Sequence, residues 1–153
     1  MTDETLDRFI ELERFLVPTT YLADGMDVSH AAPELQAKAA EVFPRAKETV
    51  TKAIARGARI ACGTDAPAIP HGKNAKELLA LVDRGMTPLG AIRAATTVAA
   101  ELIDVDDRGR LEAGLLADVI AVPGDPLRDI GVTEDVRFVM KGGQIVRHDA
   151  AGT

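Results

Sequence analysis

Two short apolar segments, separated by a long helical one, set the strongest limit on how this chain can fold. Residues 15–17 and 58–63 have the length and composition of β-strands, and an alanine-rich helical pattern covers residues 33–56 between them. Further helical patterns precede the first strand and follow the second. This order is a βα repeat, which implies parallel strands with right-handed crossovers. The sequence therefore predicts an α/β fold.

Capping residues predict where several helices begin. Thr2 or Asp3 can cap a first helix with acidic residues in its first turn. Asn74, with Glu77 three residues later, forms a capping-box-like signal for a second helix. Thr87, followed directly by a proline, predicts a third.

Proline and turn-forming residues predict where the regular elements are interrupted. Pro44 lies inside the long helical segment, so a kink or a break is expected near Phe43. The first strand is expected to continue to Tyr21, and residues 22–32 read as a loop.

The chain changes character after residue 103. Residues 104–110 are charged and turn-like, and residues 117–122 are rich in β formers. Two further β segments flank Gly142-Gly143, which is a good two-residue hairpin signal. A small antiparallel β unit is therefore expected, with a boundary near residues 104–108.

Composition excludes several classes of protein. The net charge is -6 and aromatic residues make up 3%, so the basic surface and the stacking platforms of a nucleic-acid binder are lacking. The single cysteine excludes an internal disulfide framework. No apolar run approaches the roughly 18 residues of a membrane span, and the acidic start does not look like a signal peptide. We expect a cytoplasmic protein with neither a nucleic acid nor a membrane as partner.

Asp65 is the strongest candidate for chemistry, because it follows a buried strand at the edge where parallel α/β folds gather catalytic side chains. It can ligate a metal or act as a general base, or it can simply cap the next turn. His71 lies in a loop on the same side and either lines a pocket or is exposed. Tyr21 is expected to point toward the same edge, as a substrate contact or only as a strand-end aromatic. Cys62 reads as a small buried hydrophobe.

Taken together and in order, these features resemble the amidohydrolase superfamily, most closely its imidazolonepropionase-like and Xaa-Pro dipeptidase-like branch. Each motif is weak alone, but their order and spacing make the resemblance specific. The motifs that carry it are Gly63-Thr64-Asp65-Ala66, Pro70-His71-Gly72-Lys73-Asn74, Gly85-Met86-Thr87-Pro88-Leu89, Ala91-Ile92-Arg93-Ala94-Ala95-Thr96, Gly109-Arg110-Leu111-Glu112-Ala113-Gly114, Ala117-Asp118-Val119-Ile120-Ala121-Val122, Gly124-Asp125-Pro126-Leu127 and Val139-Met140-Lys141-Gly142-Gly143.

The resemblance implies a (β/α)₈ barrel with a small β-sandwich. A complete barrel needs about 200 residues or more, and this chain has 153. By resemblance, residues 15–21 and 58–63 correspond to the seventh and eighth barrel strands. Residues 1–104 would then be the last two βα units of a TIM-type barrel, and residues 105–153 a part of the sandwich.

The implied function is that of the C-terminal fragment of a metal-dependent amidohydrolase, which hydrolyses the C–N bond of a small-molecule amide, dipeptide or cyclic amide with metal-activated water. Asp65 would be a metal ligand and the proton-shuttling residue, and His71 and Tyr21 would bind substrate. The family's histidine pairs and bridging lysine have no counterpart here. The complete enzyme is expected to hold a divalent metal, zinc in the first place, whereas this chain alone is expected to hold none and to be inactive.

Two kinds of partner are compatible with such a chain. An upstream barrel fragment would complete the enzyme, and a homo-oligomer would pair the bare strand edges. Whether the chain is itself an enzyme is therefore uncertain from its sequence. The alternative is a non-enzymatic α/β module that associates through its open sheet with a partner or with itself.

Overall fold

The two strands that pair in parallel are only two residues long each in the computed structural model, which describes residues 1–149. The elements in chain order are α1 (Asp3–Glu11), β1 (Phe15–Leu16), α2 (Leu22–Gly25), α3 (Pro33–Ala55), β2 (Arg59–Ile60), α4 (Ala75–Asp83), α5 (Pro88–Ala95), α6 (Thr97–Leu102), β3 (Val119–Ala121), the 3₁₀ helix η1 (Ile130–Glu134), β4 (Phe138–Lys141) and β5 (Gln144–His148).

The first two strands pair in parallel, as the sequence predicts. Phe15 lies opposite Arg59 and Leu16 opposite Ile60, and α3 forms the long connection between the strands. The guanidinium of Arg59 lies 4.1 Å from the centre of the Phe15 ring. This is a cation–π contact between the first residues of the two strands.

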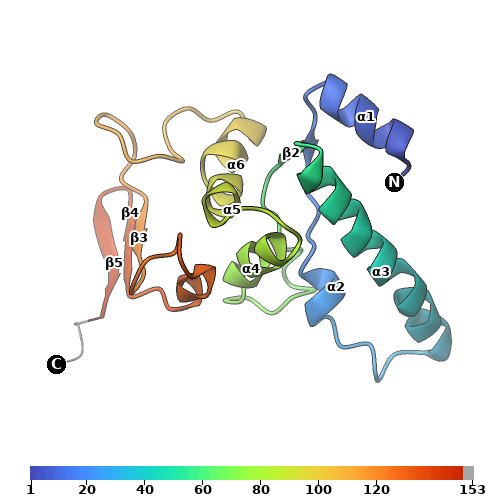
Figure 1. Ribbon diagram of the computed structural model, residues 1–153. Helices are drawn as coiled ribbons and strands as arrows, with labels where there is room; N and C mark the ends of the chain where they lie inside the picture. Colours follow the sequence, from blue (N-terminus) through green and yellow to red (C-terminus); the bar gives the residue numbers. More distant parts are fainter. Residues whose placement is uncertain (150–153) are drawn as a thin grey trace.

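The core lies where the helices cover this short sheet. Figure 1 shows α4 and α5 between the long α3 on one side and the three-stranded sheet on the other. Burial of each large aliphatic side chain contributes about 1.5–3 kcal/mol, so a few such residues account for much of the stability. The buried cluster consists of Leu6, Val50, Ala53, Ile60, Leu81, Ala91 and Ala94.

The second sheet is antiparallel, with the strand order β3-β4-β5. The β4–β5 turn is made by Gly142 and Gly143, whose φ angles of 54° and 79° are left-handed and suit glycine. Asp118, just before β3, accepts a hydrogen bond of 2.7 Å from the backbone N–H of Gly142. The predicted hairpin is confirmed. The last four residues of the predicted segment 105–153 lie outside the described residues.

Two local expectations are wrong, and a third is narrowed. The first strand ends at Leu16 and does not continue to Tyr21, because Thr19 has a left-handed φ of 44° that an extended strand cannot contain. Part of the predicted loop 22–32 is the short helix α2. Of the kink or break expected near Phe43, the break does not occur, since α3 continues past Pro44 to Ala55.

Candidate functional site

The loops that follow β1 and β2 are brought together by a close contact at Gly63. A Cβ at this position would lie 2.5 Å from Cγ1 of Val17 and 3.4 Å from Cγ2 of Thr19. Only glycine therefore allows the two chain segments to pass so closely. The two loops share the carboxyl edge of the parallel pair, where the sequence places the candidate residues.

Asp65 lies in the loop after β2, exposed and with a left-handed φ of 53°. Its backbone carbonyl accepts a hydrogen bond of 2.8 Å from the N–H of Ala68, so the residue opens a turn. Within residues 1–149, its carboxylate has no hydrogen bond or ion pair to another side chain. An exposed carboxylate at this edge is free to meet water or a ligand, and its catalytic role stays a prediction.

Tyr21 and His71 occupy different settings. Tyr21 precedes α2 and is half-buried, with its ring so close to Gly25 that a Cβ there would lie 2.5 Å from Cε1. His71 is exposed in a turn. No contact described in residues 1–149 joins either side chain to Asp65, so their roles in binding substrate also stay predictions.

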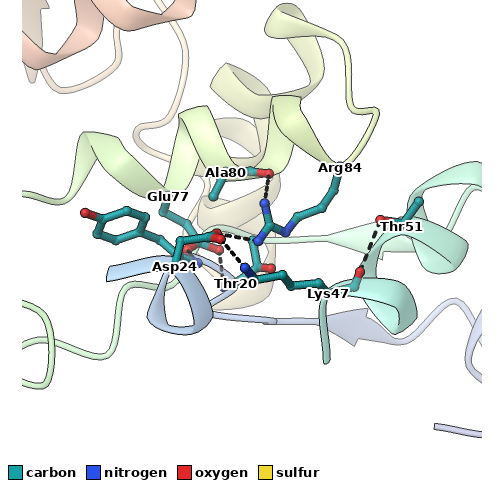
Figure 2. Close-up of polar contacts among 8 residues, drawn as sticks. Thr20, Asp24, Lys47, Thr51, Glu77, Ala80 and Arg84 are labelled. Carbon is teal, nitrogen blue, oxygen red and sulfur yellow. Dashed lines mark hydrogen bonds and ion pairs between the residues drawn. The ribbon is translucent and has the colours of Figure 1, made fainter. Parts of the chain in front are cut away.

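The most unusual side chain is Glu77 on α4, which is only 1% exposed. Its Oε1 accepts a hydrogen bond of 2.8 Å from the backbone N–H of Thr20, and its Oε2 accepts one of 2.7 Å from that of Tyr21. Figure 2 shows the carboxylate meeting the loop after β1. The prediction that Glu77 belongs to a capping box is wrong, and Asn74 makes no side-chain capping bond either.

Burial raises the pKa of Glu77, because a carboxylate loses its hydration in the interior. The backbone donors at Tyr21 and Thr20 and the nearby guanidinium of Arg84 act in the opposite direction, while the charge of Asp24 adds to the rise. The raised pKa shows that desolvation outweighs these favourable contacts.

Ion pairs surround this carboxylate. The side chain of Arg84, 8% exposed, pairs with Asp24, and Arg84 Nη1 donates to the carbonyl of Ala80 at 3.2 Å. Lys47 on α3 pairs with the other oxygen of Asp24 (Figure 2). Two buried groups, Arg84 Nε and Thr20 Oγ1, have no hydrogen-bond partner within residues 1–149.

The sequence carries a signal for this cluster, although capping rules assign Glu77 to a helix cap instead. Glu77 and Arg84 are seven residues apart, with Ala80 and Leu81 between them at helical spacing, so all four share one face of α4, whose C-cap residue is Arg84. All four are buried. Opposite charges on an otherwise apolar helical stripe indicate a buried polar contact and not a cap.

Behind the carboxyl end of β2 lies an open cavity of about 660 Å³. Cys62 and Thr64 line one part of it, and Leu78, Ile92 and Ile120 give it a largely apolar wall. Burial, assisted by the charge of Glu77, raises the pKa of Cys62 to about 12. Cys62 is half-buried, less than the sequence predicts, and its raised pKa disfavours a role as a nucleophile.

Within residues 1–149, no three His, Cys, Asp or Glu side chains come together in a group that could hold a metal ion. No helix of this described part is both long and apolar enough to cross a membrane.

Comparison with known proteins decides the family. The model of the amidohydrolase family matches residues 10–146. The chain belongs to the amidohydrolase family. The ochratoxinase of Aspergillus niger is 42% identical over 106 residues, which are 65% of this chain and 22% of that protein.

Solved structures agree with this family membership. The crystal structure of a Xaa-Pro dipeptidase with bound methionine in the active site has a TM-score of 0.88 and 39% identity, and the match covers 96% of this chain and 38% of that one. The crystal structure of A. niger ochratoxinase has a TM-score of 0.82 and 34% identity, covering 99% of this chain and 36% of that one. This amidohydrolase chain therefore spans well under half the length of these relatives.

Proposed function

We propose that this chain forms the carboxyl-terminal part of an amidohydrolase that cleaves the C–N bond of small amides or dipeptides. Residues 1–104 would contribute the last two βα units of a TIM-type barrel, and residues 105–153 a part of the accompanying β-sandwich. The observation that carries the proposal is the parallel β1–β2 pair, matched over nearly the whole chain by a Xaa-Pro dipeptidase structure of 39% identity. The names of the relatives, a dipeptidase and an ochratoxinase, support a small amide or peptide as the substrate.

Residues outside this sequence, in the same polypeptide or in a partner, would complete the barrel. The sheet of β1 and β2 contains only these two strands within residues 1–149, so each has an unpaired edge. Open edges pair readily with further strands. An upstream barrel fragment fits these edges, and we expect little hydrolysis from this chain alone. We propose a cytoplasmic location for the complete enzyme.

Asp65 would act as the proton acceptor for the water that attacks the substrate, with Tyr21 and His71 holding the substrate beside it. The metal implied by family membership, zinc in the first place, takes three protein ligands in catalytic sites. The described residues do not form such a site, since Asp65 is the single candidate ligand and no metal-binding group surrounds it. The remaining ligands would have to come from outside this sequence, and the role of Asp65 proposed here is proton transfer.

The test is co-expression of this chain with the polypeptide encoded directly upstream, or with the matching amino-terminal part of the Xaa-Pro dipeptidase relative. Hydrolysis of a dipeptide and amide panel should appear only with both parts present. Asp65→Asn should then lower kcat by about 10²-fold or more, because an amide cannot accept the proton. Asp83→Asn, an exposed aspartate on α4, is the matched control and should keep full activity. Full activity of Asp65→Asn would refute the role.

The non-enzymatic module remains the second candidate, and the same unpaired edges of β1 and β2 favour it. A second copy of the chain would pair them in a homo-oligomer. Light scattering on the purified chain separates the two proposals. A stable dimer that does not exchange with an upstream fragment supports the module, whereas a chain that binds the fragment supports the enzyme.

A further inference from the structure

The turn at Thr19–Tyr21 carries a backbone conformation that its own sequence does not favour. Thr19 has a φ of 44°, in the left-handed region, and its β-branched side chain makes that region particularly unfavourable. Such conformations persist only where the surrounding structure imposes them. A group outside the turn must therefore impose the left-handed conformation of Thr19.

Glu77 is the group in contact with the turn. Its two carboxylate oxygens accept hydrogen bonds from the consecutive N–H groups of Thr20 and Tyr21, at 2.8 and 2.7 Å. Only a side chain with two acceptor oxygens can serve both donors in this way. Because Glu77 lies on α4, the contact joins segments that are more than fifty residues apart in the sequence.

A second contact holds the next part of the same segment. Asp24 on α2 pairs with Arg84, seven residues after Glu77 on the same face of α4, and also with Lys47 on α3. The segment is therefore attached through the backbone of Thr20 and Tyr21 and again through the side chain of Asp24. Figure 2 shows Glu77, Asp24 and Arg84 in these contacts. Removal of the first attachment should release the turn while the second keeps α2 in place.

We infer that Glu77 is a positioning residue, which holds the Thr19–Tyr21 turn and thereby places the Tyr21 side chain at the carboxyl edge of the parallel strands. The effect on substrate rests on the proposed function, in which Tyr21 contacts the substrate. The effect on the turn does not, and it can be measured on this chain alone.

Tyr21 makes the first measurement direct, because the chain has one tyrosine and no tryptophan. Its intrinsic fluorescence therefore reports only this turn. In Glu77→Gln, one acceptor oxygen is replaced by an amide group that cannot accept. We expect the acrylamide quenching constant of Tyr21 to rise at least about twofold, and amide hydrogen exchange at Thr20 and Tyr21 to become at least about tenfold faster. Asp83→Asn, which removes the same charge from an exposed position on α4, should change neither.

Unchanged quenching and exchange in folded Glu77→Gln would overturn the inference. If Glu77→Gln does not fold, hydrogen exchange in the wild-type chain provides the test. The inference requires that the Thr20 and Tyr21 amides are protected there. Exchange of both as fast as that of an unstructured peptide would also overturn the inference.

The second measurement uses the completed enzyme. Glu77→Gln should raise KM about fivefold or more and change kcat less than about twofold, since it displaces a binding residue and no reacting group. A loosened turn with an unchanged KM would overturn the link to substrate. Absence of hydrolysis by the wild-type complex, together with a loosened turn in the variant, would refute the proposed function and support the positioning role.

Discussion

The reactivity of Cys62 offers a quantitative test of the interior around β2. The thiol lines the cavity behind this strand, and its backbone N–H donates to the carbonyl of Ala94 on α5 at 2.9 Å. Burial and the nearby charge of Glu77 raise its pKa from the ordinary 9.0 to about 12. Only the thiolate attacks electrophiles, so the reaction rate follows the ionised fraction.

The expected ratio of reaction rates between the unfolded and the folded chain follows from the difference between the two pKa values of Cys62. At pH 8, roughly one thiol in ten is ionised at the ordinary pKa and about one in ten thousand at the raised one, a difference of about a thousandfold. A thiolate of higher pKa is also more nucleophilic, by about 20-fold for a pKa difference of about three at a Brønsted slope near 0.45. The net expectation is that Cys62 of the folded chain reacts about 50-fold more slowly than Cys62 of the unfolded chain.

The assay is alkylation by iodoacetamide, followed by mass spectrometry, in buffer and in urea between pH 7 and 11. The rate in the folded chain should still be rising at pH 11, whereas the rate in urea should level off above pH 9. Glu77→Gln should speed the reaction of the folded chain, because it removes a negative charge that disfavours the thiolate. Equal rates in buffer and urea, or a folded-state rate that levels off near pH 9, would refute the proposed burial of this thiol.

The same shift predicts a dependence of stability on pH. The folded-state pKa is the higher one, so the unfolded chain loses its proton first as the pH rises. The stability of the fold should therefore fall between pH 9 and pH 12, by up to about 4 kcal/mol in total. The free energy of unfolding in urea should be measured for the wild type and for Cys62→Ala across this pH range. The part of its decrease that is due to the thiol is missing from the variant. A constant difference between the two proteins across this pH range would contradict the shift.

Two substitutions test the neighbouring packing. Gly25→Ala should displace the Tyr21 ring, because the new Cβ would lie 2.5 Å from Cε1. Acrylamide quenching of Tyr21 should change, while amide exchange at Thr20 should stay slow. Unaltered Tyr21 fluorescence would contradict the contact. Leu81→Ala, at a position that is 0% exposed, should lower the free energy of unfolding in urea by about 2–5 kcal/mol. Leu89→Ala, 44% exposed on α5, is its control and should cost less than about 0.5 kcal/mol; equal losses would show that Leu81 does not belong to the core.

Apart from the parallel β1–β2 pair, the features that the sequence predicts correctly are those whose partners lie nearby in the chain. The hydroxyl of Thr2 accepts a hydrogen bond of 3.2 Å from the N–H of Thr5, and that of Thr87 one of 3.1 Å from the N–H of Gly90. The turn at Gly142 closes a hairpin between adjacent strands. Such contacts depend on residue type and short spacing alone, so capping and turn rules are sufficient for them.

Two of the differences between sequence and structure depend on partners far away in the chain. Asn74 and Glu77 have the spacing of a capping box, yet Glu77 binds a loop 56 and 57 residues earlier. The end of β1 was misplaced for the same reason, because Thr19 takes its left-handed conformation where this loop meets α4. Asp65 follows β2 as predicted, but a single sequence does not indicate which other side chains will face it.

These two errors have a common physical origin. A turn that leaves a strand and enters a short helix has backbone N–H groups that no strand or helix satisfies, and a buried N–H without a partner costs about as much as a lost hydrogen bond. Thr20 is 4% exposed, so water cannot supply the acceptor. Glu77 supplies it, and the raised pKa of Glu77 records the energetic cost of burying that carboxylate. The buried acid and the strained turn therefore depend on each other: neutralising Glu77 removes an acceptor from the turn, and opening the turn leaves a buried charge without its donors.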